Sequence, residues 1–493
     1  MGISPGAACR YRRRTWVEDK HRGRALADRH TQREKKFMHG RAFAADVKPV
    51  CRQDEPGFMF RAVSITALSR PLPKLCAIAS RTSGHVARAG DASRPIHSNE
   101  TIMKKYLAIP AAVACLLASA AHAQSSVTLY GTIDAGLDYI SNQKSAAGAG
   151  PVYGVQSGNV STSRWGLRGN EDLGGGLAAV FALENGFNVA NGKLGNGGDE
   201  FGRQAWVGLA SRQWGTVTLG RQYDFLVDFV APLSATGSGF GGNLADHPYD
   251  NDNLANDTRM NNAVKFRSAD YGGFTFGGAY GFSNQGGGFS NDNAYSVGAQ
   301  YVNGPVDLAV AYLQSNQPGG VDAPQNTGGS LSSADGDAML TGGRWRTFGA
   351  GAHYAFDHAA IGFVYTRTIL NDPRELSQGG AYGRVNGQLL TFSNYELNAR
   401  YFLTPALSLG GAYTFTQGRF DDAGRGIAPK WNQFMLQADY ALSRRTDLYL
   451  EGVYQRVTGA DGVAVLGHAG IFNLAASGND RQAVVAAGIR HKF

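Results

Sequence analysis

Apolar and polar residues alternate along most of the chain from Val127 to its last residue, Phe493. In the closing segment, RQAVVAAGIRHKF, one parity holds Ala483, Val485, Ala487, Ile489, His491 and Phe493. A period of two predicts β-strands whose two faces meet different surroundings. The pattern recurs often enough to predict about sixteen strands. They are placed at 127–140, 162–171, 177–189, 201–211, 216–223, 259–269, 274–282, 294–302, 306–314, 346–356, 360–370, 390–403, 406–417, 431–442, 446–457 and 481–493.

The first predicted strand shows what the two faces meet. Leu129, Ile133 and Leu137 share one parity, whereas Asp134 and Asp138 share the other. Carboxylates are too costly for a dry core, but a water-filled lumen would solvate them. The apolar face would then meet lipid, where a sheet must close on itself because unpaired backbone groups are not tolerated.

The connections between the predicted strands alternate between short and long. Short ones include 172–176, 213–215 and 270–273, and long ones include 224–258 and 315–345. Short turns at one rim and long loops at the other are typical of an up-and-down barrel in a bacterial membrane. We therefore expect an all-β, transmembrane antiparallel barrel with long extracellular loops.

Composition separates the front quarter of the chain from the remainder. The formal net charge is +8, but residues 1–123 hold 22 of the 47 Lys and Arg and 9 of the 39 Asp and Glu. Residues 124–493 therefore carry 25 basic and 30 acidic groups, a net of −5, and contain none of the four cysteines. The basic character consequently gives the predicted barrel no reason to bind nucleic acid, and neither a disulfide nor a thiolate metal site is possible there.

Residues 103–123, MKKYLAIPAAVACLLASAAHA, have the three parts of a secretory signal peptide. Two lysines precede an apolar stretch, and an A-x-A motif predicts cleavage between Ala123 and Gln124. Residues 1–102 show no periodic pattern, so we interpret them as disordered sequence translated from an upstream start that the cell does not use. The alternative is a basic cytoplasmic arm that binds nucleic acid.

Several motifs in fixed order make residues 124–493 resemble the general trimeric porins of Gram-negative outer membranes, of the neisserial and burkholderial type. They are SSVTLYGTIDAGLDY at 125–139, STSRWGLRGNEDLGGGLAAVFALENGF at 161–187, GRQAWVGL at 202–209, GTVTLGRQYD at 215–224 and the terminal GIRHKF. The resemblance implies a sixteen-stranded barrel, three per assembly, with its third loop folded into the lumen. It implies an outer-membrane channel for passive diffusion of ions and small hydrophilic solutes, in contact with lipid and lipopolysaccharide. It also implies that Phe493 is the signal that the barrel-assembly machinery recognises.

The resemblance places the pore constriction at 224–258, with lumen arginines opposite it at Arg164, Arg203 and Arg259. Strand parity supports Arg164, which shares a face with Gly166 and Arg168, but the parity of Arg203 is less clear because Val207 shares its face. An arginine in contact with lipid at mid-depth would cost about 2–4 kcal/mol. The alternative for each is an arginine at the rim, paired with lipopolysaccharide or a loop carboxylate.

Acidic residues of the lumen are expected at Glu184 and in the long loop, at Asp224, Asp228, Asp246 and Asp250. Glu184 could equally be a surface residue near a loop. The loop stretch PLSATGSGFGGN, 232–243, has no acid, whereas cation-preferring relatives carry carboxylates there. We therefore expect a weak preference for anions. The parity of the last strand also directs Arg490 and Lys492 inward, where Arg490 could add positive charge to the lumen.

Other chemistry is not indicated by the sequence. The run DHPYDNDN at 246–253 packs carboxylates closely enough for calcium but lacks the Gly and distal Glu of an EF-hand, so we interpret it as an acidic loop and predict no metal. We also expect no cofactor and no catalytic residues, since no motif indicates a barrel hydrolase. Alternatives that stay open are a substrate-specific channel and a barrel that serves mainly as adhesin or phage receptor.

Overall fold

The computed structural model describes residues 125–318, 329–331, 338–379, 381–422, 424–460, 462–472 and 474–493. All of them belong to the unit His97–Phe493. The predictions for 1–102, for the signal peptide at 103–123 and for cleavage between Ala123 and Gln124 lie outside the described residues.

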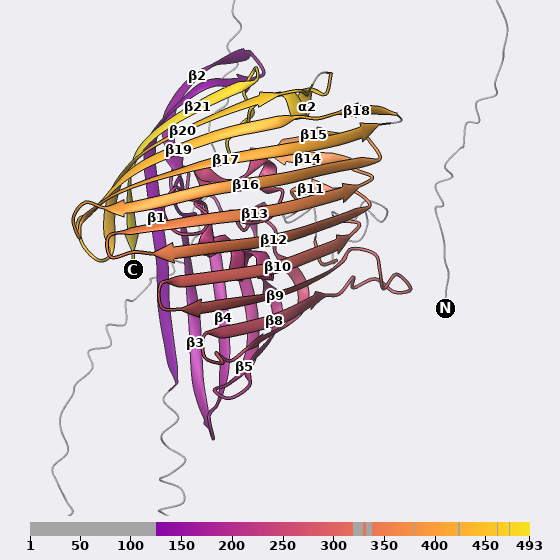
Figure 1. Cartoon of the computed structure of the whole chain (residues 1–493). Coiled ribbons are helices and arrows are strands. Elements are labelled where there is room, and N and C mark those ends of the chain that lie inside the picture. Colours follow the sequence, from indigo (N-terminus) through magenta and orange to yellow (C-terminus); the bar gives the residue numbers. More distant parts are fainter. Residues whose placement is uncertain are drawn as a thin grey trace, which may run out of the picture. The chain divides into compact units, whose positions relative to one another are not determined.

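A closed antiparallel barrel of sixteen strands forms the body of this unit, as the alternating pattern predicted (Figure 1). Its first five positions are β1 (Ser126–Ser145), the interrupted strand β2 (Gly148–Ser157) plus β3 (Arg164–Gly174), β4 (Leu177–Gly186), β5 (Gln204–Ser211) and β6 (Gly215–Gln222). The next five are β7 (Met260–Ser268), β8 (Phe274–Gly281), β9 (Asn293–Asn303), β10 (Val306–Asn316) and β12 (Arg344–Ala355). The last six are β13 (Ala359–Asn371), β16 (Leu389–Phe402), β17 (Leu407–Asp422), β19 (Lys430–Ala441), β20 (Thr446–Thr458) and β21 (Arg481–Lys492).

Shorter strands accompany the main strands of the barrel. β18 (Arg425–Ile427) belongs to the barrel sheet and pairs only with the end of β17, whereas β11 (Leu340–Thr341), β14 (Glu375–Gln378) and β15 (Ala381–Arg384) form a separate small sheet. A short helix, α2 (Ala464–Gly467), lies between β20 and β21. Among the described residues, no helix is both long and apolar enough to cross a bilayer.

The barrel closes where its first strand meets its last. β1 pairs with β21 along one edge, from Thr132 opposite Lys492 to Ile140 opposite Val484. Its other edge pairs with β3 in the first half and with β2 in the second. Phe493 follows the last strand and exchanges two backbone hydrogen bonds of 3.0 Å with Gly131. The closing ladder therefore uses the chain to its final residue.

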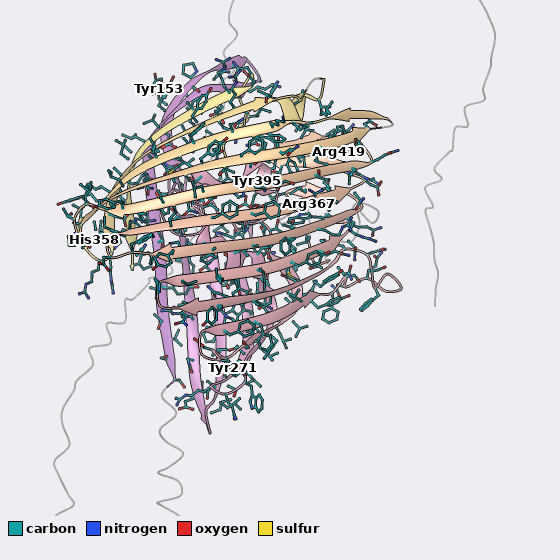
Figure 2. All side chains as sticks on the ribbon, in the orientation of Figure 1. Tyr153, Tyr271, His358, Arg367, Tyr395 and Arg419 are labelled. Carbon is teal, nitrogen blue, oxygen red and sulfur yellow. The ribbon has the colours of Figure 1, made fainter. Side chains whose placement is uncertain are left out.

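The two faces of the sheet are inverted relative to a water-soluble protein. Leu129 and Leu137 are 57% and 69% exposed, whereas Asp134 and Asp138, on the other face of the same strand, are buried. Figure 2 shows side chains such as Tyr153 and Tyr395 on the outside of the sheet, and both are exposed. The apolar surface is therefore the outer one, and the polar residues face inward.

One strand of the barrel wall was not predicted from the sequence, and neither were the short strands β11, β14, β15 and β18. Residues 148–157, GAGPVYGVQS, were left as a connection, but they form β2 and pair with the second half of β1. Two glycines and a proline weaken the alternating signal at their start, because glycine and proline usually mark turns. Pairing with the long strand β1 stabilises them as a strand in spite of that local preference.

The connection between β6 and β7, residues 223–259, folds into the barrel instead of over its rim (Figure 1). It contains η3 (Leu226–Val230), η4 (Ala231–Leu233), η5 (Gly242–Ala245) and η6 (Pro248–Asp250). Its apolar side chains, including Phe225 and Phe229, pack against the inner wall of β8, β9 and β10. We call this segment the inner loop.

Glycines on the wall create the space that the inner loop occupies. Gly277 of β8 and Gly298 of β9 face each other across the ladder. A Cβ at Gly298 would lie 2.8 Å from Phe229 and 2.9 Å from Phe225, closer than packed carbons approach. The two adjacent strands β8 and β9 thus have glycines, which lack side chains, at the positions where the aromatic rings of the inner loop pack.

Candidate pore constriction

The inner loop and the barrel wall enclose a cavity of about 370 Å³ between them. The loop contributes its stretch around Thr236, Gly237, Gly239 and Asn243, which carries no charge. The wall contributes a set of charged residues: Arg164, Glu184, Arg203, Arg490 and Lys492. The cavity is therefore positive on its wall side and neutral on its loop side.

Arg164 is the predicted arginine that this cavity exposes most. It begins β3, and its side chain is 28% exposed. Its Nη1 donates to Ser161 Oγ at 3.1 Å and to the carbonyl oxygen of Thr162 at 3.0 Å. These bonds hold the guanidinium toward the lumen, on the face that strand parity assigned to it.

Arg203 and Glu184 form a buried ion pair behind Arg164. Arg203 Nε donates to Glu184 Oε1 at 2.8 Å, and Arg164 Nε lies 3.8 Å from Glu184 Oε2. Tyr130 also donates to Glu184, at 3.0 Å. One carboxylate thus fixes two arginines, which supports the lumen position for Glu184 over a surface position.

The ambiguous parity of Arg203 has a simple structural reason. The residue lies just before the first residue of β5, Gln204, so the alternation of that strand does not apply to it. Val207, within the strand, is 58% exposed on the outer surface, whereas Arg203 is 4% exposed inside.

Arg259 belongs to the same region but does not line the cavity. It is 2% exposed, and its guanidinium lies over the ring of Tyr223 at 5.6 Å. Its Nη2 and the Nη2 of Arg203 both donate to Asn256 Oδ1, at 3.2 and 3.1 Å. Arg259 therefore stabilises the last residues of the inner loop, just before β7 begins.

The first two predicted loop acids anchor the start of the inner loop. Asp224 accepts hydrogen bonds from the backbone N–H of Leu226 and from Asn253, and burial raises the pKa of Asp224 to about 6. Asp228 lies 2.7 Å from Lys265 Nζ, which also donates to the carbonyl oxygen of Tyr223 at 2.6 Å. Neither acid lines the cavity.

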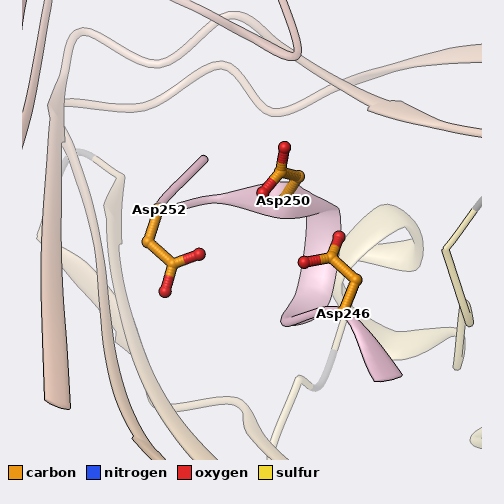
Figure 3. A group of neighbouring side chains, drawn as sticks. All are labelled: Asp246, Asp250 and Asp252. Carbon is orange, nitrogen blue, oxygen red and sulfur yellow. The ribbon is translucent and has the colours of Figure 1, made fainter. Parts of the chain in front are cut away.

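The other two, Asp246 and Asp250, lie in a second cluster deeper in the loop, together with Asp252 (Figure 3). His247 bridges this cluster to the wall: its Nδ1 is 2.6 Å from Asp252 Oδ2, and its Nε2 is 3.1 Å from Glu396 Oε2 of β16. Burial opposes the charged ring, but Asp252 and Glu396 together raise the pKa of His247 to about 10. The four predicted loop acids thus lie in two separate regions: Asp224 and Asp228 at the start of the inner loop, and Asp246 and Asp250 in the second cluster.

Arg490 connects the last strand to the tip of the inner loop. Its Nη1 donates to the carbonyl oxygen of Gly239 at 3.0 Å, and its Nε donates to Asp447 Oδ2 at 3.0 Å. Strand parity predicted the inward position of Arg490, but no local pattern indicates its contact with the loop. The contact of His247 with Glu396 was not predicted, because the two residues lie 149 positions apart.

A closed barrel with an apolar outer surface, a charged interior and an inserted loop defines a membrane channel built from strands. A model of the Gram-negative porin family matches residues 111–460. An outer membrane porin protein of Bordetella pertussis is 33% identical over 427 residues, which span 79% of this chain and all of that protein. Outer membrane porin protein 32 of Delftia acidovorans is 30% identical over 411 residues, again 79% of this chain and all of that protein.

Among solved structures, an anion-selective porin from Comamonas acidovorans superimposes with a TM-score of 0.56 at 24% identity, covering 75% of this chain and all of that one. This likeness shows the fold. The chain belongs to the Gram-negative porins and is a channel of the bacterial outer membrane. Family and fold both point to a channel instead of an enzyme.

Proposed function

We propose that this porin lets ions and small hydrophilic solutes diffuse passively, with a weak preference for anions. The observation that carries the preference is the charge of the cavity. Arg164 and Lys492 contribute positive charge on the wall, and the facing loop stretch 232–243 has none of either sign. Arg490 also lines the cavity but is paired with Asp447 and Asp439. Fixed charges that line a narrow passage raise the local concentration of the opposite ion.

The balance of charge at the cavity favours a preference for anions. Glu184 is its one carboxylate among the lining residues, and that group is already paired with Arg203 and close to Arg164. The structural neighbour from Comamonas acidovorans is described as anion-selective, which supports the same preference here.

We also propose a homotrimer, with lipid and lipopolysaccharide around its outer surface and with Phe493 as the residue that the barrel-assembly machinery recognises. OmpT of Vibrio cholerae, a structural neighbour with a TM-score of 0.50 at 15% identity, is described in a trimer form. The exposed apolar face of the strands supports contact with lipid, because such a surface is unfavourable in water.

The sign of the reversal potential tests the proposed preference. In a planar bilayer with a tenfold KCl gradient, the wild-type protein should give the sign of a channel that favours chloride. Arg164→Gln should move the potential toward cation permeation, because it removes a positive charge that is exposed on the cavity wall. The shift should shrink at high salt, where charges are screened.

Arg419→Gln is the matched control. Its side chain is 70% exposed and pairs with Asp421 outside the cavity, so the potential should not move. A wild-type potential with the sign of cation preference, or equal shifts for both variants, would contradict the proposal.

A further inference from the structure

The cluster Asp246, Asp250 and Asp252 brings three carboxylates together inside the inner loop. One oxygen from each lies within 4.8 Å of the others. Figure 3 shows each carboxylate directing an oxygen into the space between the three. Calcium coordinates oxygens at about 2.3–2.6 Å, so oxygens with this spacing can share one ion.

Two oxygens of this cluster form no hydrogen bond with the described residues. Asp246 is 1% exposed and Asp252 is fully buried, yet Asp246 Oδ2 and Asp252 Oδ1 form no hydrogen bond with the part of the chain that the structure describes. Their other oxygens are well used: Asp246 Oδ1 accepts from the N–H of His247 at 2.7 Å, and Asp252 Oδ2 accepts from Asn394 at 3.1 Å. A buried carboxylate oxygen without a donor is costly unless a cation or proton meets it.

The charges around the cluster do not balance. Four buried carboxylates, those of Asp246, Asp250, Asp252 and Glu396, surround the single cationic ring of His247. His247 is committed to Asp252 and Glu396, so Asp246 and Asp250 have no cationic partner among the described residues. Asp250 accepts only backbone hydrogen bonds, from the N–H groups of Ala255 and Asp257 at 3.0 Å.

The donor set indicates which ion would fit. Both ring nitrogens of His247 are already engaged, so only oxygens face the central space. Oxygen donors favour calcium or magnesium over zinc. Magnesium requires a near-ideal octahedron at about 2.0–2.1 Å, whereas calcium tolerates an irregular set at longer distances.

We propose that Asp246, Asp250 and Asp252 form a calcium site that fixes the fold of the inner loop inside the barrel. The ion would neutralise the two uncompensated carboxylates and cross-link η6 to the residues before and after it. His247 links the site to the wall, because it contacts both Asp252 and Glu396. The site differs from the cavity beside Arg164, which these three acids do not line.

Calcium titration of the purified protein tests this proposal. The protein is kept in detergent, freed of lipopolysaccharide and treated with chelator, because lipopolysaccharide itself binds divalent cations. Isothermal titration calorimetry should find about one saturable calcium site per chain and at least tenfold weaker binding of magnesium. Calcium should also raise the thermal unfolding midpoint relative to the chelated protein, since a ligand of the folded state stabilises it.

Asp246→Asn should weaken calcium binding at least tenfold and abolish the thermal shift. Asp228→Asn is the control, because it removes a carboxylate of the same loop that pairs with Lys265 outside the cluster. That variant should bind calcium as the wild type does.

Absence of a saturable site in the wild type up to about 10 mM calcium, roughly ten times the dissociation constant of the weakest known protein sites, would overturn the proposal. It would show that protons neutralise the cluster instead. Binding that persists undiminished in Asp246→Asn would overturn it equally, and the wild-type titration decides the matter even if that variant does not fold.

Discussion

Single buried residues, more than exposed ones, hold the constriction of this porin in place. Arg203 and Arg259 were predicted to face the lumen, and both are buried against Tyr223 and Asn256, although Arg203 still contributes to the cavity lining. They act on the pore by fixing the wall and the loop, whereas Arg164 presents its charge to the cavity. A guanidinium is suited to the buried role, because it offers several donors in a fixed plane.

His247 should make the stability of the protein depend on pH. Its pKa is raised from 6.5 to about 10, so folding favours its protonated form. The stabilisation is complete below about pH 6.5 and is lost as the pH rises through about 10. His247→Gln should therefore lower the free energy of unfolding by a few kcal/mol at pH 6, on the order expected for such a shift, and by much less at pH 10.5.

Thermal unfolding of both proteins at pH 6, 8 and 10.5 measures this difference. His358→Gln serves as control, since His358 is exposed near a strand end (Figure 2). A gap between wild type and His247→Gln that stays constant or widens with rising pH would contradict the prediction.

At the scale of elements, the inner loop and the wall strands fit each other through residues that lack side chains. Phe225 and Phe229 stack with ring centroids 5.0 Å apart and lie against Gly277 and Gly298. The glycines of β8 and β9 are therefore part of the binding surface for the loop. Packing of this density leaves little room for an added methyl group.

Gly277→Ala should displace the loop. An added Cβ would overlap the ring of Phe225 and lie 2.5 Å from the carbonyl oxygen of Phe266. We expect a cost of about 1–3 kcal/mol, typical of overpacking, and a changed single-channel conductance.

The adjacent Gly278 provides the control for that change. A Cβ there would have Val297 Cγ1 as its nearest neighbour, at 3.7 Å, which is an ordinary contact. Gly278→Ala should therefore leave both the unfolding midpoint and the conductance unchanged. Equal effects of the two variants would show that the loop does not depend on this fit.

For the whole molecule, the closing contact of the barrel is made by its terminal residues. Phe493 bonds to Gly131 through two backbone hydrogen bonds, and its ring covers that glycine so closely that a Cβ would overlap it. Closure pairs the last two open strand edges of the barrel. This pairing is required because backbone polar groups cannot stay unpaired in lipid.

Phe493→Ala should therefore reduce assembly in the outer membrane several-fold while leaving the conductance of assembled channels unchanged. Phe402→Ala is a close match, because Phe402 also ends a strand and is 39% exposed, against 38% for Phe493. The heat-modifiable form of each protein in outer-membrane fractions, separated by gel electrophoresis, measures assembly. Normal assembly of Phe493→Ala would count against its role as the assembly signal.

The barrel could be predicted well from the sequence, but the candidate site could be predicted only in part. Alternation is a local property, so strands such as β1 and β21 were predictable, and Arg164 followed from its parity within β3. Arg203 precedes its strand, so no periodicity could place it. The contacts of His247 with Glu396 and of Arg490 with Gly239 join residues about 150 and 250 positions apart, and no local pattern encodes them.

The position of the inner loop constrains the order in which the chain can fold. Residues 223–259 are enclosed by strands that follow them in the sequence, and His247 reaches β16. The contacts of the inner loop with the later strands can therefore form only once those strands are in place. The barrel closes by pairing β1 with β21, the first and last strands of the ladder. These contacts join residues that are very far apart in the sequence, and topologies with such contacts fold slowly. The rate-limiting event in folding this porin should be the joining of that seam.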